Sequence, residues 1–317
     1  MKRICKRIGR IALIVIAALL ALVILVLGGL NIAKFGIYFD YYRIKTDVCK
    51  NPGLNDGFAC QGICADEASD RFLISGYMID GSASRIYVTD LENRVHYVNL
   101  SQNGEPYTGH TGGIALHGDT VYVANGGHIY RLSLQEIVNA SNGAELDIGE
   151  GVAVNSAASF AYATDQYIYV GEFHNGKNYV TDHPYDTPDG TYHAIVSRYT
   201  HDDLLKPDRI YSIRDQVQGI CFTPDGQVVL STSYGLADSY YYIYRESDAI
   251  LSEHVLDGAP VYYLSHYETA LKGPAMSEGL DWYDGKLLTM AESACDKYIF
   301  GKFFFAYYLV TLDIQAL

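Results

Sequence analysis

Three glutamates stand where short apolar runs begin or end, and carboxylates at such places can do chemistry. Glu172 and Glu292 each follow an apolar run, and Glu278 directly precedes Gly279 and Leu280. If the fold brings the three carboxylates together, their charges repel one another unless protons or a cation intervene. Ca²⁺ is the hard cation that carboxylate oxygens suit best. A metal site on Glu278, Glu172 and Glu292, holding Ca²⁺, is therefore one hypothesis.

Side-chain amides occupy matching positions in other parts of the chain. Gln61 and Gln218 each precede a Gly-Ile pair, and Asn125 follows an apolar run. Their carbonyl oxygens could complete a Ca²⁺ coordination shell. The alternative, which we favour, is that these polar groups cap strand ends and hold water, as buried polar groups commonly do.

Two histidines and a serine extend the candidate set. His110 and His174 lie in polar loops, and Ser233 follows an apolar run. Two histidines and a glutamate could bind Zn²⁺, but their spacing matches no recognised motif, and loop histidines are usually solvated. The predicted ligand-binding residues are Gln61, His110, Asn125, Glu172, His174, Gln218, Ser233, Glu278 and Glu292.

Tyrosine offers a different chemistry, because its ring is apolar and its hydroxyl is polar. Tyr234, Tyr240 and Tyr298 could form an aromatic rim suited to sugar rings, although tyrosines in this region could equally serve strand packing. The sequence contains neither a Gly-x-Ser-x-Gly motif nor a glycine-rich phosphate loop. It therefore assigns no catalytic residue.

The elements that must position these residues recur along the chain. A small residue, a large apolar residue, a turn and an apolar strand follow one another five times, at spacings of 46 to 60 residues. Units of about four strands at such spacing are typical of a β-propeller. The sequence predicts an all-β fold, a five-bladed propeller, with six blades as the alternative. The five stretches are Gln61-Gly62-Ile63, Gly112-Gly113-Ile114, Ala158-Ser159-Phe160, Gln218-Gly219-Ile220 and Glu278-Gly279-Leu280.

In a propeller the first strand of each unit lines a central tunnel, so the candidate residues would form a polar ring at one tunnel mouth. Only 38 residues follow Gly279, too few for a fourth strand in the last unit. We expect an extended segment near residues 35–48 to supply that strand and close the ring. The predicted organisation is a cytoplasmic basic tail at 1–10, a transmembrane signal anchor at 11–32, a closing strand and connector at 33–58, and the propeller at 59–317.

The repeated Gly-Ile or Gly-Leu opening resembles propellers of the NHL-repeat and SMP-30/gluconolactonase kind over residues 59–313. That resemblance implies the fold, and it implies a metal ion held in the tunnel by acidic and Asn side chains. The stretches Gln218-Gly219 and Met276-Ser277-Glu278-Gly279 also resemble uncharacterised membrane-anchored propeller proteins of bacteria. That second likeness implies no activity.

Residues 11–30 contain no charge and no proline, and 20 helical residues span about 30 Å, the thickness of a bilayer core. Five basic residues precede this run, so we expect residues 1–10 in the cytoplasm and the rest outside, as a single-pass plasma-membrane protein. A cleaved signal peptide is the alternative. Residues 11–317 carry 18 basic and 37 acidic residues, which argues against a nucleic-acid partner.

Cysteine usage leaves the redox setting open. Cys49 and Cys60 could close a short disulfide loop, whereas Cys64 and Cys221 occupy matching positions typical of buried thiols. The sequence favours an extracytoplasmic binding module for a glycan, a small ligand or an envelope protein. The alternative is a metal-dependent hydrolase of the lactonase or phosphoesterase type, centred on Glu278 with Glu172 and Glu292.

Overall fold

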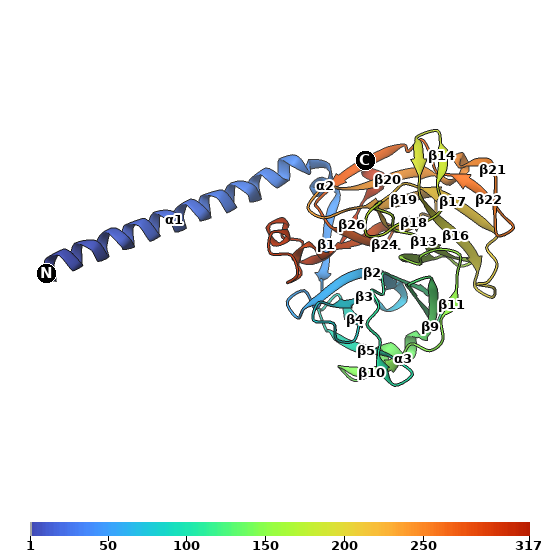
Figure 1. Cartoon of the computed structure of the whole chain (residues 1–317), viewed down its shortest axis with the longest axis horizontal. Helices are drawn as coiled ribbons and strands as arrows, with labels where there is room; N and C mark the ends of the chain where they lie inside the picture. The colour runs from blue at the N-terminus through green and yellow to red at the C-terminus, as the bar shows by residue number, and fades with distance from the viewer. Residues whose placement is uncertain (1) are drawn as a thin grey trace.

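The computed structural model describes residues 2–317, with side chains from residue 6 onward. A helix of 36 residues, α1 (Lys2–Ile37), projects away from a body built of strands (Figure 1). Its apolar part is long enough to cross a membrane, and none of that part is buried against the body. The helix is therefore free to be covered by lipid.

Five strands form the innermost layer of the body. Each contacts two of the others, in the circular order β2, β7, β12, β18, β24 and back to β2. Because this ring closes, the body is a five-bladed propeller, and the six-bladed alternative is not observed. The inner strands are β2 (Phe58–Asp66), β7 (Gly113–His117), β12 (Phe160–Ala163), β18 (Val217–Phe222) and β24 (Ser277–Tyr283).

Each inner strand begins a blade that runs outward by antiparallel pairing. The first blade continues through β3 (Arg71–Met78), β4 (Arg85–Asp90) and β5 (His96–Gln102), with β6 (Glu105–Pro106) and the parallel strand β10 (Ala144–Asp147) beside β5. The second continues through β8 (Thr120–Asn125), β9 (His128–Ser133) and β11 (Val152–Ala153), and the short helix α3 (Leu134–Asn139) follows β9.

The third blade is the widest. It runs through β13 (Tyr167–Gly171), β16 (Ala194–Thr200), β17 (Arg209–Ile213), β22 (Ala259–Tyr263) and β21 (Ile250–Leu256), and the hairpin β14 (Tyr185–Thr187) and β15 (Gly190–Tyr192) projects from it. The fourth blade continues through β19 (Gln227–Thr232), β20 (Ser239–Arg245) and β23 (Thr269–Gly273). Buried side chains fill the spaces between neighbouring blades, so the core is divided among those interfaces.

The fifth blade joins the two ends of the chain. It contains β24, β25 (Lys286–Ala291), β26 (Tyr308–Leu312) and, as its outer strand, β1 (Lys45–Lys50). The strand begins later than the extended segment expected at 35–48, because α1 continues to Ile37 and a second helix, α2 (Phe39–Ile44), follows. Tyr41 and Ile44 are the buried residues of α2, and their spacing of three suits a helix rather than a strand.

The inner glycines explain how five strands fit around one axis. A Cβ atom at Gly62 would lie 2.6 Å from the backbone nitrogen of Ile114, and one at Gly113 would lie 2.3 Å from that of Ala161. Gly219 and Gly279 face the next strand in the same way. In the third blade the equivalent residue is Phe160, not Ser159 as the sequence comparison assumed. Ser159 therefore corresponds to Gln61, Gln218 and Glu278.

The described cysteines do not form the expected disulfide. Cys49, Cys60, Cys64, Cys221 and Cys295 are all buried thiols. Cys60 instead accepts a hydrogen bond from the Asn51 amide at 3.2 Å, and burial raises its pKa well above the ordinary value for a thiol. These thiols are packing residues of the blade interfaces.

Candidate functional site

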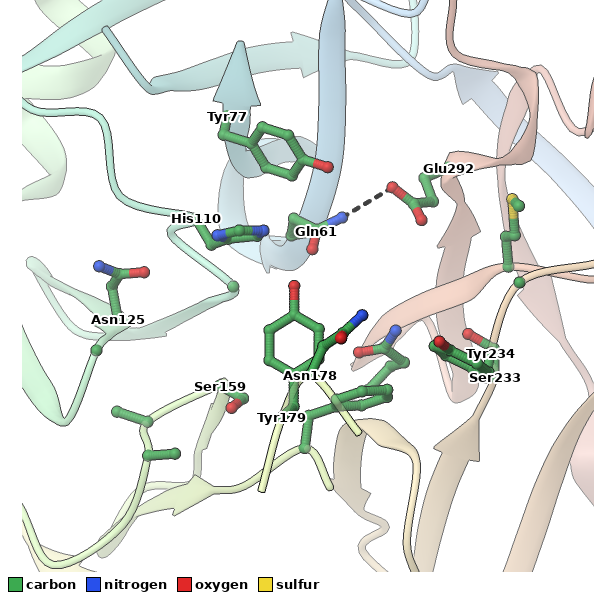
Figure 2. A pocket seen from close by; sticks show the side chains of 18 of the residues that line it. Gln61, Tyr77, His110, Asn125, Ser159, Asn178, Tyr179, Ser233, Tyr234 and Glu292 are labelled. Atoms are coloured by element: carbon green, nitrogen blue, oxygen red, sulfur yellow. Dashed lines mark hydrogen bonds between the residues drawn. The ribbon is translucent and has the colours of Figure 1, made fainter. Parts of the chain in front are cut away.

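A cavity of about 640 Å³ opens at one mouth of the tunnel. The starts of the inner strands supply Gln61, Ser159 and Gln218, and loops from several blades supply the walls. Figure 2 shows these side chains around a common space. The volume lies in the range of small-molecule sites. Six of the nine predicted ligand-binding residues line this cavity: Gln61, His110, Asn125, Gln218, Ser233 and Glu292.

Aromatic rings form much of the wall. The His110 ring packs on Tyr77, with centroids 4.5 Å apart, and meets Tyr179 edge-on at 6.4 Å. Of the three tyrosines of the predicted aromatic rim, Tyr234 and Tyr298 line the cavity, whereas Tyr240 lines a neighbouring groove that Tyr234 also borders. Burial, followed by the nearby Lys297 charge, lowers the pKa of His110, so its imidazole is neutral near pH 7.

Glu292 supplies a carboxyl group to the cavity. It lies in the 3₁₀ turn η3 (Glu292–Ala294), directly after β25, and its carboxylate accepts a hydrogen bond of 3.0 Å from the Gln61 amide (Figure 2). Burial raises the pKa of Glu292 to about 7, although Tyr298, Lys297 and Gln61 act in the opposite direction. Its charge therefore changes within the physiological range of pH.

Glu278 lies beneath this surface and does not line the cavity. Its side chain is 2% exposed, and its closest polar contact is the Gln218 amide at 3.4 Å. Burial, followed by the charge of Glu292, raises the pKa of Glu278 well above the ordinary value. Burial and the charge of Glu292 thus both favour the protonated form of Glu278.

Glu172 is held apart from the other two glutamates. One of its carboxylate oxygens accepts the Ala157 amide at 3.0 Å, and the other accepts the Ile195 amide at 3.2 Å and contacts His183 at 2.9 Å. The hydrogen bond with Glu172 raises the pKa of His183. The proposed metal site on Glu278, Glu172 and Glu292 is therefore not assembled, because Glu172 already has partners that fix the loop after β13.

His174 also lies outside the cavity. Its Nδ1 accepts the Thr181 backbone amide at 3.1 Å, and its ring stacks on His193, with centroids 4.6 Å apart and planes 14° from parallel. His193 in turn contacts Asp215 at 3.0 Å. Among the residues with described side chains, these three form the one group of potential metal ligands. Stacked rings direct their nitrogen lone pairs side by side rather than to one tetrahedral centre, which disfavours Zn²⁺.

Asn125 and Ser233 line the cavity, and each also forms hydrogen bonds with neighbouring parts of the protein. The Asn125 oxygen accepts the Thr111 amide at 3.1 Å, and its nitrogen donates to the Tyr107 hydroxyl at 2.7 Å. The Ser233 hydroxyl donates to the Ser277 carbonyl at 2.8 Å. Both side chains therefore keep a fixed direction before any ligand arrives.

Sequence reasoning missed several lining residues, among them four with polar or aromatic side chains. Tyr77 lies at the end of β3, Asn178 and Tyr179 belong to the long loop between β13 and β14, and Lys297 lies shortly after η3. Loops carry no repeat, so spacing gave no signal for the last three. Tyr77 could have been found, because it occupies the same strand-end position as Glu292.

Comparison with known proteins adds few constraints. No family model matches the chain, and no curated protein matches it. A glucose dehydrogenase of Thermus thermophilus, titled a putative oxidoreductase, is 15% identical over 84% of this chain and 99% of its own, with a TM-score of 0.45. A PQQ-bound aldose sugar dehydrogenase from Streptomyces coelicolor is 15% identical over 78% and 76%, with a TM-score of 0.42.

Hydrazine synthase of Kuenenia stuttgartiensis is 11% identical over 74% of this chain but 56% of its own, with a TM-score of 0.39. This chain therefore spans little more than half of that protein. The five sheets and the closed inner ring define the class, a five-bladed β-propeller that carries an N-terminal apolar helix. The resemblance to the NHL and SMP-30 kind of propeller remains an expectation.

Proposed function

We propose that this protein is an extracytoplasmic propeller, anchored by α1, that binds a neutral polyhydroxylated ligand such as a sugar or a glycan end. The observation that supports this proposal most directly is one cavity whose wall combines aromatic rings with amide and carboxyl groups held in fixed directions. Sugar rings present apolar faces and hydroxyl edges, and tyrosine rings with Asn, Gln and Glu side chains complement both.

The shape of the site supports a small ligand over an envelope protein. A concave cavity buries most of a small molecule, whereas protein partners usually need a larger and flatter surface. The charges support a neutral ligand, because Glu292 and Lys297 both face the cavity and neither sign dominates. The basic residues at the start of α1 support placing the propeller outside the cytoplasm.

Saturation-transfer NMR of the purified full chain with a panel of neutral mono- and disaccharides tests the ligand class. We expect a saccharide that binds the wild type and the Tyr240→Ala variant but not the Tyr234→Ala variant, since Tyr234 lines the cavity and Tyr240 lies in the neighbouring groove. Binding that survives Tyr234→Ala unchanged, or no binding by any saccharide, would refute the proposal.

Orientation has a separate test. The cysteines with described side chains are buried, so Ser82→Cys, placed in an exposed turn of a Cys5→Ser background, gives one accessible label. A membrane-impermeant maleimide should label this variant in intact cells. Labelling that appears only after lysis would place the propeller on the other side.

One specific observation supports the alternative that the protein is an enzyme. Glu292, with a pKa of about 7, could exchange a proton with a bound ligand near neutral pH. A metal-dependent hydrolase, however, would need the three glutamates together, and Glu172 is engaged elsewhere. Turnover that is lost in Glu292→Gln and insensitive to chelators would favour a metal-free enzyme over a binding module.

A further inference from the structure

One segment of the fifth blade exposes four large apolar side chains on the surface of the protein. It runs from η3 to β26 and includes the 3₁₀ turn η4 (Gly301–Phe304). Ile299 is 74% exposed, Phe300 67%, Phe303 39% and Phe305 42%. A contiguous apolar patch of this kind marks a contact surface for a partner or a membrane.

The position of the segment identifies the partner. Turn η4 contacts α1, and the Lys34 ammonium lies 4.7 Å from the centre of the Phe305 ring. Figure 1 shows the dark red segment on the side of the propeller from which α1 leaves. At the end of α1 itself, Phe35 and Ile37 are also exposed. The apolar surface of the helix thus continues onto the propeller.

The position of α1 in the bilayer determines the depth at which this segment lies relative to the lipid. The apolar run of α1 is first interrupted by Asn31, directly after Leu30, and Lys34, the first charged residue beyond it, lies about 6 Å further than Leu30 along the helix axis. A residue beside Lys34 therefore lies at the level of the lipid headgroups whenever the run spans the bilayer. Phenylalanines on the apolar face of interfacial segments insert at that level, and lysines near helix ends extend their ammonium groups to it.

The charges near the segment agree with this placement. Lys297 and Lys302 belong to the segment and Lys34 lies over its Phe305 ring, while the chain beyond residue 10 carries 37 acidic residues against 18 basic ones. Lys302 is paired with Asp296 at 2.5 Å, and Lys34 and Lys297 stand over tyrosine or phenylalanine rings. Phospholipid phosphates attract such lysines and would repel most other faces of the propeller.

We propose that Ile299, Phe300, Phe303 and Phe305 insert into the headgroup and upper acyl region of the bilayer that α1 spans. The inference rests on the proposed membrane anchor. It adds a second contact, which fixes how the propeller is oriented on the membrane. Because Lys297 and Tyr298 begin the same segment and line the cavity, that contact also places the mouth of the ligand site near the lipid surface.

Tryptophan fluorescence of the full chain in phosphatidylcholine nanodiscs tests the insertion. The single native tryptophan is first removed by Trp282→Phe, in a background shown to melt as the wild type does. One tryptophan is then placed in the segment by Phe300→Trp, and Ile299→Trp serves if that variant fails to fold. Leu19→Trp reports the anchor, and Leu205→Trp, 78% exposed in the loop between β16 and β17, is the matched exposed control.

Brominated phosphatidylcholine should quench the tryptophans of Leu19→Trp and Phe300→Trp and shift the latter emission to the blue, and it should leave Leu205→Trp unchanged. Quenching of Leu19→Trp alone would overturn the insertion and leave the anchor standing. If Leu19→Trp is not quenched, the anchor fails and the insertion fails with it. Protection of Phe300→Trp from both brominated lipid and aqueous iodide would show a protein partner instead, and would also overturn the proposal.

Discussion

Replacing Glu292 by glutamine should remove most of a pH-dependent loss of stability. The folded-state pKa of Glu292 is about 7, against 4.5 for an ordinary glutamate. The folded protein therefore keeps a proton that the unfolded chain releases, and the free energy of unfolding falls as pH rises from 4.5 to about 7. At 1.36 kcal/mol per pH unit, the loss is about 3 kcal/mol above pH 7.

Glutamine cannot ionise, and its carbonyl oxygen can still accept the hydrogen bond from Gln61. We expect Glu292→Gln to match the wild type near pH 5 and to be more stable by about 3 kcal/mol at pH 8, since only the wild type then carries a buried charge. For a domain of this size that difference corresponds to roughly 5–10 °C in melting temperature. Removing the Glu292 charge also lowers the pKa of Glu278 toward its ordinary value, in the same direction.

Melting temperatures of the purified full chain, measured from pH 5 to pH 8 in one detergent, check this expectation. Glu253→Gln is the matched control, because Glu253 is exposed on β21, far from the tunnel. Parallel curves for Glu292→Gln and the wild type would refute the reasoning, since they would mean that Glu292 carries no perturbed proton. A destabilised Glu292→Gln at pH 8 would show that the charge is needed by Lys297.

Two further changes address the fold. Gly62→Ala should destabilise the protein by about 1–3 kcal/mol, because the new Cβ would lie 2.6 Å from the Ile114 nitrogen, and a melting curve equal to the wild type would contradict the close approach of the inner strands. A chain that begins at residue 51 should lose its sharp melting transition, because β26 becomes an open edge, whereas a chain that begins at residue 38 keeps β1 and should retain it. Equal transitions in the two truncations would mean that β1 is dispensable.

The arrangement of blades was predictable from the sequence because it repeats. Each Gly-Ile or Gly-Leu pair marks a place where two inner backbones touch, and that steric need leaves a visible residue pattern. The glycine pattern is absent from the one blade in which a larger residue stands where two inner strands approach each other. In the third blade Phe160 occupies the glycine position, so the small residue Ser159 was aligned one place too early.

The site was less predictable than the fold. Gln61 and Glu292 could be placed together, since strand starts and neighbouring strand ends share one face of a propeller. Glu172 also follows the second strand of its blade, so the same rule places it at the tunnel mouth. Its carboxylate instead accepts a hydrogen bond from His183, in the loop that follows, and does not line the cavity. Loop conformation decides such outcomes, and loops without repeats leave no periodic signal. The aromatic alternation at residues 35–44 misled in a similar way, because helix and strand patterns are hard to distinguish over short apolar runs.

The joining of β1 to β26 sets the order in which the protein can be completed during synthesis. β1 directly follows the helices α1 and α2, and it leaves the ribosome more than 250 residues before its partner β26 (Lys45–Lys50 against Tyr308–Leu312). Pairing between such distant segments is slow, and the nascent fifth blade keeps an open edge until it occurs. Glu292, Lys297 and Tyr298 all precede β26 in that blade. An unfinished chain therefore has no complete cavity, and ligand binding by newly made protein would report that the ring has closed.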